Sequence, residues 1–158
     1  MNTLLLIGTM LMLLLTGCDT KIEPDKPTDG KYATQNQTSS LEYSIYMNKQ
    51  ITVFTNQLST RMGSAKNISN GYNVDNEITL AEQSLSVMQA AYDETNTVYP
   101  PNGADDDRQA TLTAMETSIS HMENYIEDLK SNNDVSGYFK DFENDFNQLA
   151  GLASLYYE

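Results

Sequence analysis

The sequence predicts an all-α protein, an antiparallel up-down-up-down four-helix bundle behind a disordered tether. From Ser39 onward, apolar residues recur in alternating steps of four and three, which is the heptad pattern of packed helices. Short polar segments at 69–71, 100–103 and 131–134 divide this region into four stretches. Helices joined by such short connections pack antiparallel to one another. A three-helix bundle with the first helix loosely attached is the structural alternative.

The first predicted helix, 39–68, begins with SSLE, in which Ser39 and Glu42 have the spacing of a capping box. It is the most polar of the four helices, and it places the charged residue Arg61 on its apolar stripe. The stripe consists of Met47, Ile51, Phe54, Leu58, Arg61, Ala65 and Ile68.

The second predicted helix, about 75–98, ends before PPNG, because Pro100 disfavours a helical conformation at Tyr99. Its stripe consists of Val74, Ile78, Ala81, Leu85, Met88, Tyr92, Thr95 and Tyr99.

The third predicted helix, about 105–131, carries three aspartates in its first turn, where carboxylates meet free N–H groups. Its stripe consists of Arg108, Leu112, Met115, Ile119, Met122, Ile126 and Leu129. The fourth, about 135–157, follows SNND, and either Asp134 or Ser136 is its predicted N-cap. Its stripe consists of Val135, Phe139, Phe142, Phe146, Leu149, Ala153 and Tyr156.

An apolar run at residues 4–15 precedes the only cysteine of the chain. The run is too short for an ordinary membrane-spanning helix and has the length of the apolar region of a signal peptide. Residues 15–18, LTGC, resemble the lipobox of bacterial lipoproteins, which has an aliphatic residue, two small residues and a cysteine. The resemblance implies cleavage after Gly17 and attachment of a diacylglyceryl group to Cys18. The mature protein would then be lipid-anchored to the cell membrane on its extracytoplasmic side.

These patterns predict three regions: a lipoprotein signal peptide at 1–17, a lipidated N-terminus with a flexible linker at 18–38, and the bundle at 39–158. The linker contains two prolines, one glycine and few residues that could form a core, which is typical of a disordered segment. A flexible chain of about 20 residues has an r.m.s. span of about 25 Å. We therefore expect the linker to lift the bundle off the membrane.

The chain is acidic, with a net charge of −13 and a pI of about 4.2. Binding of nucleic acid requires clustered Lys and Arg, so this composition argues against a nucleic-acid partner. A single cysteine excludes an internal disulfide framework and a zinc site made of several cysteines. The first predicted helix carries Lys49, Arg61 and Lys66 against one glutamate, whereas the other three helices are acidic.

The segment 132–143, NNDVSGYFKDFE, resembles a degenerate EF-hand loop. Oxygen-bearing residues alternate in its first half, a glycine occupies the sixth position and a glutamate the twelfth, as Ca²⁺ coordination requires. The candidate calcium ligands are Asn132, Asp134, Ser136, Tyr138 and Glu143. The alternative is an ordinary turn between helices, and no second loop is present to pair with this one.

His121, the only histidine, falls off the predicted apolar stripe, so we expect it to be exposed. No motif of a nucleophile, a phosphate-binding loop or a metalloprotease occurs, so we predict no enzymatic activity and no cofactor. The expected function is that of a membrane-anchored lipoprotein that binds another protein or a component of the cell envelope. A ligand-binding or calcium-binding sensor that uses 132–143 is the alternative.

Overall fold

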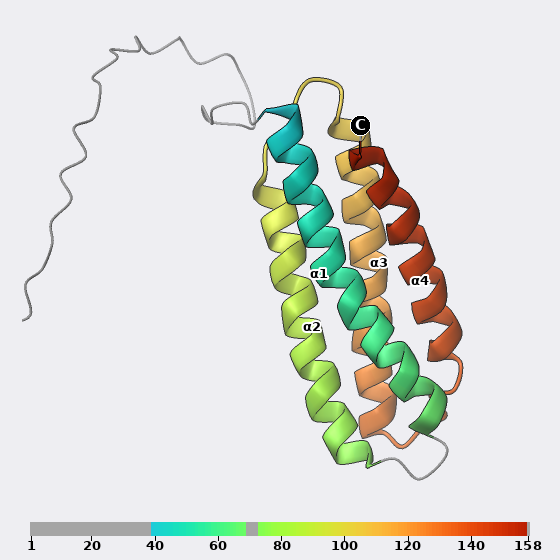
Figure 1. The fold of residues 1–158 in the computed structure, drawn as a ribbon. Coiled ribbons are helices and arrows are strands. Elements are labelled where there is room, and N and C mark those ends of the chain that lie inside the picture. The colour runs from blue at the N-terminus through green and yellow to red at the C-terminus, as the bar shows by residue number, and fades with distance from the viewer. Residues whose placement is uncertain (1–38, 69–72, 158) are drawn as a thin grey trace, which may run out of the picture. The chain divides into compact units, whose positions relative to one another are not determined.

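The computed structural model describes residues 39–68 and 73–157. The bundle in Figure 1 consists of four α-helices, and a short 3₁₀ turn, η2 (Ser154–Tyr156), follows the last of them. The helices are α1 (Ser40–Asn67), α2 (Val74–Thr97), α3 (Asp105–Lys130) and α4 (Tyr138–Ala153).

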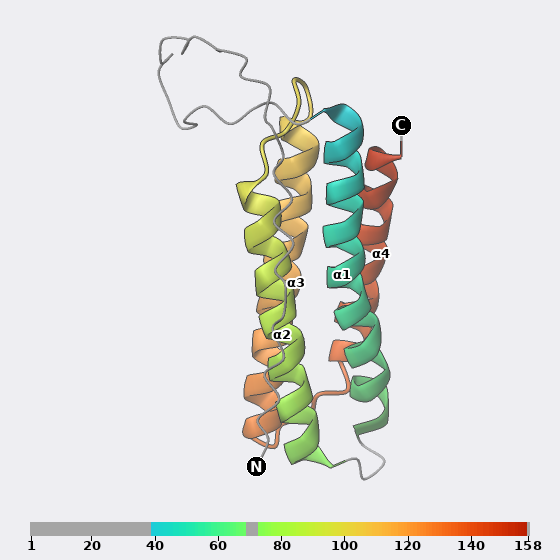
Figure 2. The ribbon, with the colours of Figure 1, turned by 60° about the vertical axis from the view of Figure 1, so that its left-hand side comes forward.

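The four helices form an antiparallel bundle in which each packs against two others. The packed pairs are α1–α2, α2–α3, α3–α4 and α4–α1, which closes the ring around one core. Figure 2 shows α1 lying alongside α4 as well as α2. The predicted four-helix bundle is thereby confirmed, and the alternative with a loosely attached first helix is wrong, because α1 packs along both of its neighbours.

Helix α1 begins with the predicted capping box. The Ser39 hydroxyl accepts a hydrogen bond from the Glu42 N–H at 3.3 Å, and the Glu42 carboxylate accepts one from the Ser39 N–H at 3.2 Å. These bonds satisfy donors that a helix start otherwise leaves free. The predicted stripe of α1 is buried from Met47 to Ala65, and Ile68 packs at its margin.

The predicted stripe of helix α2 is confirmed in part: Ala81, Met88 and Thr95 are buried, but its larger apolar residues are not at the centre of the buried face. The apolar residues Val74, Ile78, Leu85 and Tyr92 are only partly buried and flank the core. The central buried positions are more polar and consist of Glu77, Ala81, Ser84, Met88, Ala91 and Thr95. The buried face of α2 therefore also includes Glu77, Ser84 and Ala91, which the predicted stripe left out.

Helix α3 begins with the predicted aspartates, and Arg108 on its stripe is buried. The Arg108 guanidinium donates hydrogen bonds to the carbonyl oxygens of Thr95, at 3.3 Å, and Asn96. A cation at this place stabilises the carbonyl end of α2, which the helix itself leaves without partners.

Helix α4 starts at Tyr138, three residues later than predicted, and its N-cap Gly137 makes no side-chain capping bond. The prediction of Asp134 or Ser136 as N-cap is therefore wrong. Val135 is buried as predicted, but it belongs to the connection and not to the helix. Within α4, Phe142 and Leu149 are buried, and the Phe142 ring packs edge-on against Tyr125 with centroids 5.3 Å apart.

Candidate functional site

The predicted lipid attachment residue, Cys18, lies outside the described residues, as do the signal peptide and the linker. The structure does show where the chain enters the bundle. Ser39 caps the start of α1. The start of α1 and η2 lie at the same end of the bundle, as shown by the hydrogen bond that Asn48 of α1 donates to the Tyr156 carbonyl at 3.0 Å. None of the described helices is both long and apolar enough to span a membrane.

Asp134, one of the candidate calcium ligands in the connection from α3 to α4, has a partner within the protein. The Asp134 carboxylate accepts a hydrogen bond from the Ser136 N–H at 2.9 Å, and this bond holds the pKa of Asp134 below its usual value. Asn132 adopts a left-handed conformation with φ of 54°, which asparagine tolerates better than most residues. Together these features form a tight turn.

The two later candidates belong to α4 itself. The Tyr138 hydroxyl donates to Asp128 at 2.7 Å, and burial together with this carboxylate raises the pKa of Tyr138 to about 12. Glu143 pairs with Lys140 at 2.6 Å. Within 39–68 and 73–157, no three His, Cys, Asp or Glu side chains are grouped so that they could hold a metal ion. Calcium would have to displace these existing partners of Asp134 and Glu143.

A histidine–aspartate pair joins α3 to α4. The sequence did not predict this pair. His121 Nδ1 lies 2.8 Å from Asp145 Oδ2, and the imidazole side chain is only 33% exposed, so the prediction of an exposed His121 is wrong. Asp145 is buried, and burial raises its pKa against the opposing effect of His121. Asp145 follows His121 by 24 residues on another helix, so no local spacing could have revealed the pair.

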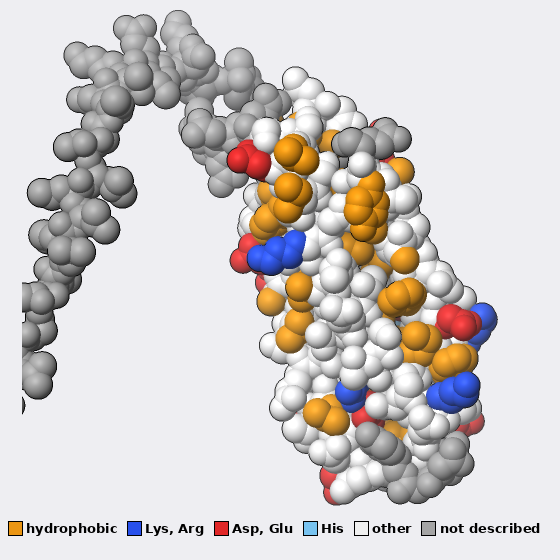
Figure 3. Space-filling model, viewed as in Figure 1, with side chains coloured by type: hydrophobic (Ala, Val, Ile, Leu, Met, Phe, Trp, Pro, Cys, Tyr) orange, Lys and Arg blue, Asp and Glu red, His pale blue; other side chains and the backbone are white. Residues whose placement is uncertain are grey.

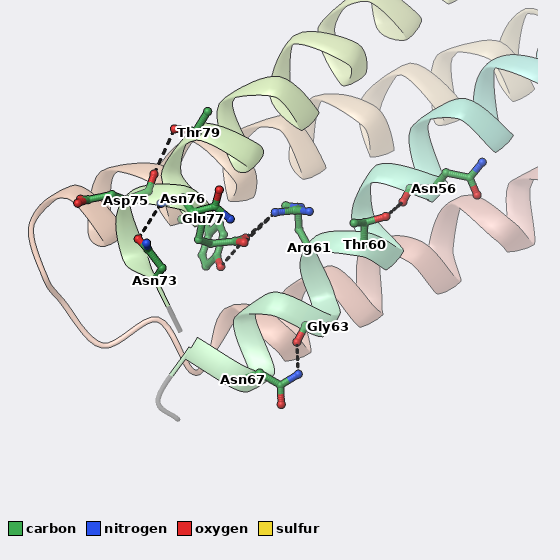
Figure 4. Close-up of polar contacts among 11 residues, drawn as sticks. Asn56, Thr60, Arg61, Gly63, Asn67, Asn73, Asp75, Asn76, Glu77 and Thr79 are labelled. Atoms are coloured by element: carbon green, nitrogen blue, oxygen red, sulfur yellow. Dashed lines mark hydrogen bonds and ion pairs between the residues drawn. The ribbon is translucent and has the colours of Figure 1, made fainter. Parts of the chain in front are cut away.

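A buried charged cluster connects α1, α2 and α3. Figure 4 shows Arg61 and Glu77 pointing toward one another across the α1–α2 interface. Arg61 Nη1 lies 2.9 and 2.8 Å from the two carboxylate oxygens of Glu77, and the Tyr125 hydroxyl donates to the same carboxylate at 3.1 Å. Arg61 Nε is buried and has no hydrogen-bond partner among the described residues. The arrangement links three helices through side chains that are almost fully buried.

A shallow groove of about 320 Å³ runs between α2 and α3. Leu85 and Ile126 form its apolar floor, while Glu82, Glu123 and Glu127 line it with carboxylates. Lys130 also lines the groove and pairs with Glu82 at 2.6 Å, with both side chains about half exposed. Helix α2 contains no Lys or Arg, and α3 contains only Arg108 and Lys130, so this face of the bundle is acidic. We call it the acidic groove.

Comparison with known proteins gives no relative from which a function could be transferred: no protein-family model, no curated protein and no solved structure matches the chain.

Proposed function

We propose that the protein is a lipid-anchored extracytoplasmic lipoprotein whose four-helix bundle binds a partner protein and performs no catalysis. The proposal combines two parts, an anchor at Cys18 and a binding surface on the bundle. The anchor rests on the lipobox-like sequence at 15–18 and on its place behind an apolar run. The binding surface rests on the acidic groove between α2 and α3.

The acidic groove is the observation that carries the proposed binding. An apolar floor lined with carboxylates complements a protein segment in which apolar side chains are flanked by Lys or Arg. All three glutamates of the groove are exposed, and the carboxylate of Glu82 is already paired with Lys130. A basic segment would therefore meet the carboxylates of Glu123 and Glu127 first. Its apolar residues would contact Leu85 and Ile126.

Replacement of Cys18 by serine tests the anchor. The change removes the sulfur to which the acyl group would be attached and lies far in the sequence from every residue of the core, so the bundle should fold as before. Wild-type protein should fractionate with membranes and carry the mass of a diacylglyceryl group, whereas Cys18→Ser should lack this mass. The same lipid mass on both proteins would refute the anchor.

The double substitution Glu123→Gln/Glu127→Gln tests the groove. Crosslinking in intact membranes should join the wild-type protein to a partner through a basic peptide of that partner, and the double variant should lose the crosslink. Asp75→Asn/Asp93→Asn provides the control, because it makes the same change of charge at exposed positions of α2 outside the groove. Equal loss in both variants, or crosslinks to acidic peptides, would contradict binding at the groove.

A further inference from the structure

Exposed apolar side chains gather at one end of the bundle. In the first two turns of α1, Leu41 and Ile45 are 69% and 62% exposed. Leu155, within η2, and Tyr157, directly after it, are 47% and 78% exposed. Among the exposed large apolar residues of the described chain, Val87 alone lies elsewhere, on α2. We call Leu41, Ile45, Leu155 and Tyr157 the apolar end patch.

The two halves of the apolar end patch are neighbours in space. Leu41, Ile45 and Asn48 follow one another at steps of four and three, so they share a face of α1. Asn48 bonds to the main chain of η2 at Tyr156, and the rings of Tyr43 and Tyr156 pack edge-on beneath, with centroids 5.9 Å apart. Figure 1 shows the start of α1 and the end of α4 at the same end of the bundle. Apolar side chains are visible over the first turns of α1 in the space-filling view of Figure 3.

We propose that the apolar end patch docks onto the lipid surface to which Cys18 is attached. This inference rests on the proposed lipid anchor. The chain enters the bundle at Ser39, two residues before Leu41, so the patch lies at the point where the predicted linker from the membrane ends. A linker with an r.m.s. span of about 25 Å keeps the patch within reach of the bilayer.

The anchor allows a weak contact to matter. Once one part of a molecule is bound, a second contact forms at a high effective concentration and needs little affinity of its own. Leucine and isoleucine gain from leaving water, and tyrosine places an apolar ring and a polar hydroxyl at a membrane interface. Four such side chains on one edge of the bundle suit the boundary between headgroups and acyl chains.

Carboxylates outnumber cations near the patch. Lys49, one turn after Ile45 on α1, is an exposed cation and stands against four carboxylates at this end of the bundle. Glu42 lies in the first turn of α1, and Asp105, Asp106 and Asp107 lie in the first turn of α3, which starts at the same end. An anionic bilayer would repel these carboxylates, whereas a zwitterionic bilayer would not. Docking should therefore be strongest on phosphatidylcholine and should weaken as anionic lipid is added.

Docking through this edge would also orient the bundle. The residues of the apolar end patch belong to α1 and to the segment that follows α4 in the chain, which is η2 and Tyr157. The acidic groove lies between α2 and α3. Helices α1 and α4 pack against each other on one side of the ring, and α2 and α3 on the other. Contact of the first pair with lipid would leave the acidic groove facing away from the membrane, where a partner could approach it.

A fluorophore on a single introduced cysteine tests the docking. Cys18 is the only natural cysteine and would be acylated in the anchored protein, so Ser154→Cys would supply the only free thiol, next to Leu155. Ser86→Cys is the matched control, because Ser86 is exposed on α2 next to Val87. Each labelled protein is anchored in phosphatidylcholine vesicles that contain a quencher attached to the acyl chains, and the lipid on Cys18 is verified by mass.

The quencher should reduce the fluorescence at position 154 several times more than at position 86. Adding Leu41→Ser/Ile45→Ser to the Ser154→Cys protein should remove most of this quenching and leave the lipid on Cys18 unchanged. Equal quenching at the two positions, or quenching that survives the double substitution, would overturn the docking while the anchor stands. Absence of lipid on Cys18 would overturn the anchor and the docking together.

Discussion

Arg61 and Glu77 show how much one pair of buried charges can matter. Burial deprives both groups of water, and their mutual hydrogen bonds compensate only while both are present. We expect Arg61→Met to lower the free energy of unfolding by about 3–5 kcal/mol. The substitution leaves Glu77 as a buried charge that keeps only the hydrogen bond from Tyr125 within this cluster. Urea denaturation measures this loss.

The double variant Arg61→Met/Glu77→Leu should be more stable than the sum of the two single variants predicts, because it removes both charges at once. Lys130→Met is the control at an exposed pair, and it should cost at most about 1 kcal/mol. Additive losses at Arg61 and Glu77 would show that the two groups act independently.

The sequence could reveal only half of this cluster. Arg61 stands on a heptad stripe and was predicted to face the other helices, which is confirmed. Glu77 was missed because a glutamate between Asn76 and Ile78 looks like a solvent-facing residue in any hydropathy pattern. Its partner is 16 residues away on another helix, so the pairing depends on how α1 and α2 pack and not on local spacing.

At the scale of single elements, α4 gives a direct test of its packing. Phe142 is fully buried between Tyr125 and Tyr138, whereas Asn144 is exposed on the same helix. Phe142→Ala should therefore cost about 3–5 kcal/mol of unfolding free energy. Asn144→Ala, measured in the same denaturant titration, should change it by less than about 0.5 kcal/mol. Similar losses in the two variants would contradict the observed face of α4.

The connection between α3 and α4 gives a second test at this scale. Because Asp134 and Glu143 are engaged with Ser136 and Lys140, we expect millimolar Ca²⁺ to leave the melting temperature unchanged. A ligand that binds only the folded state raises the melting temperature by mass action. A Ca²⁺-dependent rise that Glu143→Gln abolishes would establish the calcium sensor in place of this expectation.

The predicted elements differ from the observed ones where apolar residues do not mark the buried face. Helices α1 and α3 were predicted to within about two residues, because caps and heptad residues agree there. In α2 the buried face includes Glu77 and Ser84 beside Ala81 and Met88, so the apolar residues identify only part of it. In α4 buried Val135 extended the apparent stripe into the connection, where the Asp134–Ser136 turn delays the helix start.

For the whole molecule, hydrogen bonds from tyrosines tie neighbouring helices together and make stability depend on alkaline pH. Tyr46 of α1 donates to the Glu94 carboxylate of α2 at 2.5 Å, and Tyr138 of α4 donates to Asp128 of α3. The pKa of both Tyr46 and Tyr138 is raised from 10.0 to about 12. Burial is the larger cause, and the hydrogen-bonded carboxylate is the next. A raised pKa in the folded state means that the bundle binds protons that the unfolded chain has lost.

The stability from these two tyrosines should therefore be complete below pH 10 and should be lost as the pH rises through about 12. Urea denaturation at a series of alkaline pH values should show this decline, with tyrosinate absorbance reporting the ionisation. The Tyr46→Phe/Tyr138→Phe variant should decline less steeply over the same interval. A pH dependence identical to that of the wild type would place the cause in other groups.

The pairing of α1 with α4 joins the first and the last helix of the described chain, which has a consequence for the order in which the bundle assembles. Neighbouring helices along the chain can pair soon after they form, but α1 must wait for α4, which is synthesised after the other three described helices. Such non-local contacts close late and slow folding, because a long loop must be ordered first. Tyr43 illustrates the delay, since its partner Tyr156 follows 113 positions later, at the end of the described chain. Until then the side of α1 that α4 covers in the finished bundle stays exposed, so a nascent bundle would be most vulnerable to aggregation and proteolysis along α1.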